Sequence, residues 1–307
     1  MVDMQNLIDN LRGVLKKDYP LKNLNWFKVG GTAEYFFVPA DVEDLIFFLQ
    51  NKPIDLAITI LGAGSNALIS DMGVHGVVVK LSNLNSCYFL EDGTIFAEAG
   101  CLNSNISQLA LRGDKNIVPP QGGLEFLSGI PGSIGGAITM NAGSFGREFC
   151  DICVSVQALT LEGKIINLDK EDLGFAYRKN SISMPLIFIS SILKGYSDIP
   201  ENINKKLNDI KIKREDSQPK KVLTGGSTFA NPKENNPKGY KAWELIDKVG
   251  LRGYRIGDAG FSQKHCNFII NYGSAKAEDI EKLIIEAQHR VKEEFGILLH
   301  QEIKLIK

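Results

Sequence analysis

The sequence predicts an α+β protein. Short runs of apolar and β-branched residues, separated by Gly, Asn and Asp, fill most of the region from Ser82 to Leu193. Amphipathic helical patterns lie before, within and after this region, and the chain has no internal repeat. At 307 residues, 44% hydrophobic and 23% charged, the chain has the composition of a globular protein with a large core in two or three domains.

The first region alternates helices with strands and is expected to end at residue 81. Leu7, Ile8, Leu11, Val14 and Leu15 recur at helical spacing, which predicts an amphipathic N-terminal helix and not a signal peptide. The remaining predicted elements are a strand over 33–38, a helix over 42–50 and strands over 56–61 and 77–81.

Two further regions complete the predicted organisation into domains 1–81, 82–200 and 201–307. The second region is expected to hold a helix over 103–111 and strands over 94–98, 155–160, 164–167 and 186–193. The third region follows a basic helical stretch over 202–215. It contains a clear amphipathic helix over 277–295, ended by Gly296, and then a strand over 297–306.

A glycine-rich run over residues 129–146 is the most informative part of the sequence. It has six glycines in eighteen residues and no charged residue. Glycine accepts positive φ and lets a ligand approach backbone amides, so with Ser133 and Asn141 the run predicts a loop around a polyanion such as a pyrophosphate. The alternative, a series of tight turns between short strands, explains such a long uncharged loop less well.

A second glycine turn follows the apolar run at 56–61. Gly62-Ala-Gly-Ser-Asn-Ala67 superficially fits a dinucleotide-binding fingerprint, but the next strand follows too soon for a crossover helix and lacks the ribose-binding acid. The turn is therefore predicted to hold phosphate through its amides and hydroxyl, outside a Rossmann fold. A P-loop is also absent, because Gly163-Lys164 lacks the rest of that motif.

Composition limits the other functions. The net charge of −1 gives no sign of a nucleic-acid partner, and no apolar run is long enough for a membrane span. Five scattered cysteines form no disulfide framework, which agrees with a cytoplasmic location, and Cys150 and Cys153 lack partners for a metal or redox motif. We therefore expect no metal site.

Three residues, in the middle and at the end of the chain, are ambiguous by composition alone. Arg178, beside Tyr177, is more typical of a surface ion pair than of a carboxylate clamp. Ser227, after two glycines, is more typical of a turn than of an acid. Glu302 is expected on a strand, on one face with His300 and Lys304, where a surface ion pair is the simpler interpretation.

Six motifs occur in order along the chain: Phe27-Lys-Val-Gly-Gly31, Leu61-Gly-Ala-Gly-Ser-Asn66, Gly129-Ile-Pro-Gly-Ser-Ile-Gly-Gly136 with Met140-Asn-Ala-Gly143, Tyr177-Arg178, Gly226-Ser-Thr-Phe229 with Asn231-Pro232, and Glu302 near the end. Taken together, they resemble the motifs of the UDP-N-acetylenolpyruvoylglucosamine reductase family along nearly the whole chain. The absence of a long insertion after Tyr177-Arg178 makes the chain look like the shorter, type II branch.

The resemblance implies a vanillyl-alcohol-oxidase-like (PCMH-type) FAD fold for the first two regions and a substrate-binding third region. It implies non-covalent FAD held by residues of both glycine segments: Gly62, Ala63, Gly64, Ser65, Asn66, Gly129, Ile130, Pro131, Gly132, Ser133, Gly135, Gly136, Ala137, Asn141 and Gly143. It also implies substrate contacts by Tyr177, Asn231, Tyr240 and Lys264.

The same resemblance implies the chemistry. NADPH would reduce FAD, NADP would leave, and the flavin would reduce the enolpyruvyl group of a UDP-sugar, giving UDP-N-acetylmuramate for peptidoglycan. Ser227 would be the proton donor, while Arg178 and Glu302 would act on the substrate carboxylate. The expected protein is a cytoplasmic monomer. The alternatives are an FAD-linked sugar or alcohol oxidase of the same fold and a non-catalytic nucleotide-binding protein, neither of which needs all three residues.

Overall fold

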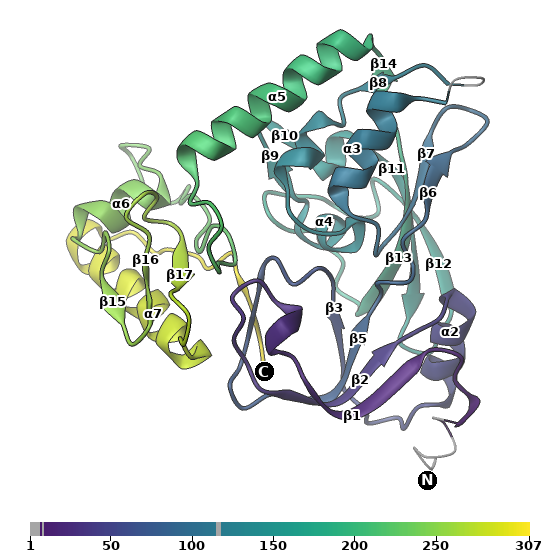
Figure 1. Cartoon of the computed structure of the whole chain (residues 1–307), viewed down its shortest axis with the longest axis horizontal. Coiled ribbons are helices and arrows are strands. Elements are labelled where there is room, and N and C mark those ends of the chain that lie inside the picture. Colours follow the sequence, from purple (N-terminus) through teal and green to yellow (C-terminus); the bar gives the residue numbers. More distant parts are fainter. Residues whose placement is uncertain (1–6, 8, 115–117) are drawn as a thin grey trace. The chain divides into compact units, whose positions relative to one another are not determined.

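The computed structural model describes residue 7 and residues 9–114 and 118–307 (Figure 1). The chain forms two compact units, each built from separated segments. Unit 1 comprises the described residues of Met1–Lys17, Tyr35–Ala63 and Gly76–Arg214, and unit 2 comprises Asp18–Glu34, Gly64–His75 and Glu215–Lys307. The three consecutive domains expected from the sequence stay a prediction.

Most residues of a four-stranded sheet lie in unit 1. The strand order is β1-β2-β5-β3, with β1 at Val14–Pro20, β2 at Thr32–Val38, β5 at Val74–Lys80 and β3 at Ile58–Leu61. Helix α2, Val42–Asn51, begins where the Asp41 carboxylate accepts a hydrogen bond from the Asp44 amide. Its buried Leu45, Phe48 and Leu49 pack in a core with Phe37 of β2. The predicted strand and helix in this region are confirmed.

The predicted N-terminal helix is wrong for its second half. Residues 14 and 15 belong to β1, and Leu7 lies in a helical turn that ends before Leu11, while Ile8 lies outside the described residues. Gly13 separates the two parts, and a β-carbon there would lie 2.2 Å from the Val38 carbonyl oxygen. Helical spacing was misleading because β-branched and long side chains on a half-exposed edge strand fit either pattern over so few residues.

A five-stranded antiparallel sheet is the second sheet of unit 1. Its order is β12-β11-β13-β7-β6, with β12 at Ile165–Asp169, β11 at Cys153–Thr160, β13 at Leu186–Leu193, β7 at Ile95–Glu98 and β6 at Cys87–Phe89. Helix α3, Asn103–Arg112, and the short helix α4, Ile134–Met140, share an apolar core with this sheet (Figure 1). Strands β7, β11, β12 and β13 and helix α3 agree with the sequence prediction to within about two residues at each end, whereas β6 was not predicted.

Smaller elements connect these layers. They are β8 (Gln121–Gly122) paired with β14 (Tyr196–Ser197), β9 (Gly143–Ser144) paired with β10 (Arg147–Glu148), the 3₁₀ turns η1 (Lys22–Leu24), η2 (Glu125–Gly129) and η3 (Phe149–Asp151), and helix α5 (Pro200–Ser217). Helix α5 confirms the helical stretch that was expected before the third region.

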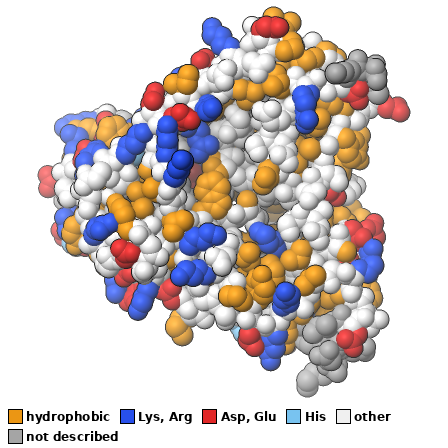
Figure 2. All heavy atoms as spheres, viewed as in Figure 1, with side chains coloured by type: hydrophobic (Ala, Val, Ile, Leu, Met, Phe, Trp, Pro, Cys, Tyr) orange, Lys and Arg blue, Asp and Glu red, His pale blue; other side chains and the backbone are white. Residues whose placement is uncertain are grey.

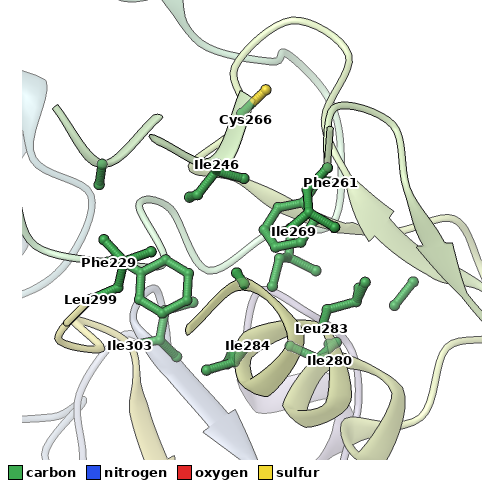
Figure 3. Close-up of a cluster of buried hydrophobic side chains, with 14 of the residues drawn as sticks. Phe229, Ile246, Phe261, Cys266, Ile269, Ile280, Leu283, Ile284, Leu299 and Ile303 are labelled. Carbon is green, nitrogen blue, oxygen red and sulfur yellow. The ribbon is translucent and has the colours of Figure 1, made fainter. Parts of the chain in front are cut away.

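Unit 2 is built around one apolar core (Figure 3). Helix α7, Ala277–Phe295, buries one stripe of side chains and ends at Gly296 with φ of 66°, as its periodicity predicts. Each fully buried Leu or Ile of this stripe contributes roughly 1.5–3 kcal/mol of transfer free energy. Residues from distant segments complete the core, among them Phe27, Val29 and Leu68.

The strands of unit 2 are short. They are β15 (Arg255–Ile256), β16 (Ala259–Phe261) and β17 (Ile269–Asn271) in one antiparallel sheet, and β18 (Lys304–Ile306) parallel to β4 (Ala67–Ile69). Helix α6, Ala242–Lys248, was not predicted. The predicted strand over 297–306 is wrong before Lys304, because residues 297–303 bury alternate side chains while running through irregular backbone.

The surface carries both signs of charge. Lys and Arg side chains and Asp and Glu side chains are spread over the face seen in Figure 2. In the described part of the chain, no helix has the length and hydropathy that crossing a bilayer requires. All five cysteines are free thiols, and the described residues contain no cluster of His, Cys, Asp and Glu suited to a metal ion.

Candidate active site

The glycine-rich run at 129–146 is not one long loop, which corrects the sequence interpretation. Its centre is helix α4, preceded by Ser133 in extended conformation and ended by Asn141 in the left-handed region. The helix was missed because three of its first four residues, Ile134, Gly135 and Gly136, are β-branched or glycine and have weaker helical propensity than alanine. The segment therefore presents a helix N-terminus, where backbone amides favour an anion.

The two glycine segments meet in unit 1. A β-carbon on Gly62 would lie 3.0 Å from the Ser133 hydroxyl oxygen, so the turn after β3 and the start of α4 lie against each other. At Gly136 a β-carbon would have no atom within 4 Å, and among the described hydrogen bonds none is made by its amide or by the Ser133 side chain. Open space, an available amide and an available hydroxyl fit a diphosphate.

Lys80 adds a positive charge to this place, although the sequence interpretation did not select it. Its ammonium donates a hydrogen bond of 2.9 Å to the Gly62 carbonyl. Burial lowers the pKa of Lys80, because a cation withdrawn from water loses hydration. The sequence showed only a lysine at the end of an apolar run. The structure pairs this lysine with Leu61, the last residue of β3.

Asn141 holds the segment that carries Tyr177 and Arg178. Its side chain is fully buried, and its amide donates to the Glu148 carboxylate at 2.9 Å and to the Ala176 carbonyl at 3.1 Å. Its carbonyl oxygen accepts from the Cys150 amide at 2.9 Å. Because these bonds use the whole Asn141 side chain, its effect on a bound cofactor would be through the backbone that it orders.

Arg178 is held in a defined place by its neighbours. Its guanidinium donates to the Gly143 carbonyl at 3.0 Å and lies 4.8 Å from the centre of the Tyr177 ring. Its φ of 59° is in the left-handed region, which is uncommon for a non-glycine residue and frequent at functional sites. Gly143 permits this approach, since a β-carbon there would lie 3.0 Å from the guanidinium.

Ser227 and Glu302 lie on neighbouring backbone segments in unit 2. The amide of Glu302 donates 2.8 Å to the carbonyl of Thr228, the residue after Ser227. No hydrogen bond to the Ser227 hydroxyl occurs within the described ranges. The expectation that Glu302 shares a strand face with His300 and Lys304 is wrong, because Glu302 precedes β18 in irregular backbone.

The Gly64–Asn66 part of the upstream turn also belongs to unit 2. A β-carbon on Gly64 would lie 2.0 Å from the Leu24 carbonyl oxygen, so only glycine fits there. The side-chain amide of Asn66 donates a 3.0 Å hydrogen bond to the Glu302 backbone carbonyl. The Asn66 backbone carbonyl accepts one from the Lys304 amide at 2.9 Å. Asn66, selected for a cofactor, therefore also fixes the backbone of Glu302.

The other predicted substrate contacts have structural partners in unit 2. The Asn231 carbonyl oxygen accepts from the Ala242 amide at 3.0 Å and so caps the start of α6. The Tyr240 ring packs edge-on against Phe295. The Lys264 ammonium donates 2.7 Å to the Glu215 carbonyl. One bond leaves the Lys264 ammonium with further donors, so it can still contact a ligand, as can the Tyr240 hydroxyl and the side-chain NH₂ of Asn231.

Comparison with known proteins identifies the relatives. Residues 33–169 match a family model described as an FAD binding domain, and residues 218–306 match the C-terminal domain of UDP-N-acetylenolpyruvoylglucosamine reductase. The chain is 46% identical to that reductase from Rickettsia bellii over 297 residues, which cover 96% of this chain and 95% of the relative. The crystal structure of the Thermus caldophilus reductase is 32% identical, with 97% and 100% coverage and a TM-score of 0.79.

The class of protein comes first: the chain is a flavoprotein with an FAD-binding domain followed by a C-terminal domain. The α+β class expected from the sequence is confirmed. With 46% identity over nearly its whole length, the chain belongs to the UDP-N-acetylenolpyruvoylglucosamine reductase family.

Proposed function

We propose that this protein uses FAD and NADPH to reduce UDP-N-acetylglucosamine enolpyruvate to UDP-N-acetylmuramate, a UDP-sugar precursor of peptidoglycan, as a cytoplasmic monomer. The observation that carries the proposal is the pairing of the Ser227 and Glu302 segments through the 2.8 Å bond from the Glu302 amide to the Thr228 carbonyl. Reduction of an enolpyruvyl double bond needs a proton donor for the carbon next to the carboxylate, a step that oxidation of a sugar or alcohol does not include.

Non-covalent FAD would be held by the glycine segments. The amide of Gly136, the hydroxyl of Ser133 and the turn at Gly62 would contact its diphosphate, and Lys80 would offset part of the negative charge. When bound, FAD supplies hydride transfer, which no amino-acid side chain provides.

Arg178 would bind the carboxylate conjugated to the substrate double bond. Negative charge delocalises into this carboxylate when the far carbon accepts hydride, and a guanidinium offers permanent charge and a planar pair of donors. Its contacts with Gly143 and Tyr177 support this role, because a cation already held in place spends little entropy on binding. Tyr177 would then line the same part of the substrate.

Ser227 would donate the proton to the carbon next to the carboxylate. A hydroxyl is a weak acid in water, but a carbanion-like carbon is a strong base, so proton transfer proceeds where water is excluded. Glu302, in its protonated form, would donate a hydrogen bond to the developing enolate. Asn231, Tyr240 and Lys264 would contact the remainder of the UDP-sugar.

An anaerobic titration tests the whole proposal. NADPH is added to the FAD-loaded protein while the flavin absorbance is followed, and UDP-N-acetylglucosamine enolpyruvate is added next. Bleaching followed by rapid recolouring with the enolpyruvyl substrate is expected. Bleaching that only oxygen reverses would favour an oxidase, and no flavin signal with FAD supplied would remove the basis of the assignment.

A further inference from the structure

Asn267 hydrogen-bonds the backbone of the segment that carries Ser227. The Asn267 side chain is 5% exposed and lies in the turn between β16 and β17. Its carbonyl oxygen accepts from the Phe229 amide at 2.9 Å, and its amide donates to the Phe229 carbonyl at 2.8 Å. The Asn267 side chain thus pairs with both the N–H and the C=O of Phe229, as a neighbouring β-strand would.

The backbone of the same residue extends the contact. The Asn267 carbonyl accepts from the Thr228 amide at 2.7 Å, and Phe268 forms an isolated β-bridge with Ser227. Three consecutive residues, from Ser227 to Phe229, are therefore aligned by Asn267 and its neighbour. Buried bonds of this kind resist displacement, because breaking them leaves polar groups without partners.

The turn that presents Asn267 is itself fixed. The Ser262 amide donates to the Phe268 carbonyl at 2.8 Å, and the Ser262 hydroxyl accepts from the His265 amide at 3.3 Å. The His265 ring nitrogen Nδ1 accepts a hydrogen bond from the Asn267 backbone amide at 3.3 Å. The centres of the His265 and Phe268 rings are 4.9 Å apart. Asn267 therefore has a rigid support within unit 2.

Without such support the Ser227 segment has a flexible start. Gly226 precedes it with φ of 83°, and a β-carbon there would have no atom within 4 Å. A glycine with open space around it permits rotation of the chain that follows. On the other side, the segment is joined to the Glu302 region by the bond from the Glu302 amide to the Thr228 carbonyl.

We propose that Asn267 is a positioning residue, which sets the place of the Ser227 hydroxyl relative to the substrate by fixing the backbone of Thr228 and Phe229. The inference rests on the proposed role of Ser227 as proton donor. A displacement of a reacting group by about 1 Å costs about 100-fold in rate, so loss of Asn267 should slow proton donation selectively.

The test measures the two half-reactions of FAD-loaded Asn267→Ala and Asn267→Asp by anaerobic stopped flow. The Asp variant keeps the side-chain size but has no donor for the Phe229 carbonyl, so it remains informative if the Ala variant does not fold. Flavin reduction by NADPH should stay within about twofold, whereas reoxidation by the enolpyruvyl substrate should slow by about 10- to 100-fold. The solvent deuterium isotope effect on reoxidation should rise, because proton transfer then limits the rate.

A double variant separates positioning from stability. In Ser227→Ala, adding Asn267→Ala should cause no further loss, since nothing remains to be positioned. Asn271→Ala is the matched control, because Asn271 is 3% exposed and bonds the backbone of Phe27, Gly273 and Ala275 instead. It should lower the melting temperature without a selective effect on reoxidation.

Four results would overturn the inference. Equal slowing of both half-reactions, or a full additional loss in the double variant, would mean that Asn267 has only a structural role. Normal reoxidation in the Asn267 variants with slow reoxidation in Ser227→Ala would refute the positioning role alone. Normal reoxidation in Ser227→Ala would refute the proposed proton donor and the inference with it.

Discussion

At the scale of single residues, Ser227 offers the most direct separation of the two half-reactions. Ser227→Ala removes one hydroxyl that makes no hydrogen bond within the described residues, so the fold should persist. Flavin reduction by NADPH should be nearly unchanged, while reoxidation by the enolpyruvyl substrate should slow by about 10²- to 10⁴-fold. Anaerobic stopped-flow absorbance measures both. Equal losses in the two half-reactions would contradict the role.

Arg178 is expected to need its guanidinium and not only its charge. In Arg178→Lys the cation remains, but the planar pair of donors is lost together with the stacking on Tyr177 and the bond to Gly143. Reoxidation of the flavin should slow by about 10²- to 10³-fold, with reduction by NADPH within about twofold. Arg112→Lys, on an exposed face of α3, is the control and should retain activity. A wild-type rate of flavin reoxidation in Arg178→Lys would contradict the proposed binding of the substrate carboxylate by the guanidinium.

At the scale of elements, the two adjacent glycines of α4 have different tasks. Alanine favours a helix over glycine by about 1 kcal/mol, and a β-carbon on Gly136 has open space. Gly136→Ala should therefore leave the stability of the flavin-free protein unchanged or raised. It should nevertheless weaken FAD binding at least about tenfold, because the methyl group occupies the space proposed for the diphosphate.

Fluorescence titration of the flavin-free protein with FAD, together with thermal unfolding, checks this prediction. Gly135→Ala is the matched variant in the same helix turn. Its β-carbon would lie 3.1 Å from the Ala99 β-carbon, so a loss of stability is expected there. Normal FAD affinity in Gly136→Ala would move the proposed diphosphate site away from α4.

At the scale of the whole molecule, unit 2 is discontinuous in sequence. The core around α7 includes Phe27, Val29 and Leu68, and the Asp71 carboxylate accepts hydrogen bonds from the first amides of α7 at 3.0 and 3.1 Å. A fragment of residues 201–307, which is the predicted third domain, lacks all of these groups. It is expected to populate no cooperatively folded state.

Near-ultraviolet circular dichroism and proton NMR of that fragment test the expectation, with the full chain measured in parallel. Poor dispersion of the amide signals and a broad thermal transition are expected, because the core would be left with cavities and the first amides of α7 would lose the Asp71 carboxylate. A dispersed spectrum with a sharp transition would show that residues 201–307 form an autonomous domain.

Buried thiols should make the whole molecule sensitive to alkali. Burial raises the pKa of Cys153 and that of Cys266 to about 11, because a thiolate is poorly solvated in the core. In the unfolded chain thiols ionise near pH 8.5, so the stabilisation is complete below about pH 8.5 and is lost as the pH rises towards 11.

Urea unfolding under reducing conditions at pH 7, 8.5 and 10 measures this loss. The midpoint should fall above pH 8.5, and the Cys153→Ala/Cys266→Ala variant should show a shallower fall, although its stability at pH 7 is lower. An equal fall of the urea midpoint with pH in both proteins would show that groups other than these two thiols cause the loss of stability in alkali.

Most regular elements follow from local pattern. The strand over 33–38 and the helices over 42–50, 103–111 and 277–295 were predicted within a few residues, since each has a clear period and end signals such as Gly296. The errors lie where tertiary contacts override pattern, as at Val14, in α4 and before Lys304.

The sequence by itself indicated a polyanion ligand, because glycine spacing is a local property of the chain. The order of its motifs gave the resemblance to one family, and that resemblance made Arg178, Ser227 and Glu302 the candidate catalytic residues. Only the tertiary structure decided that Asn66 supports Glu302, that Lys80 reaches Gly62 and that Asn267 aligns the segment of Ser227. These contacts join residues from 18 to 236 positions apart, and no periodicity or motif encodes which distant backbone groups a buried polar side chain will satisfy.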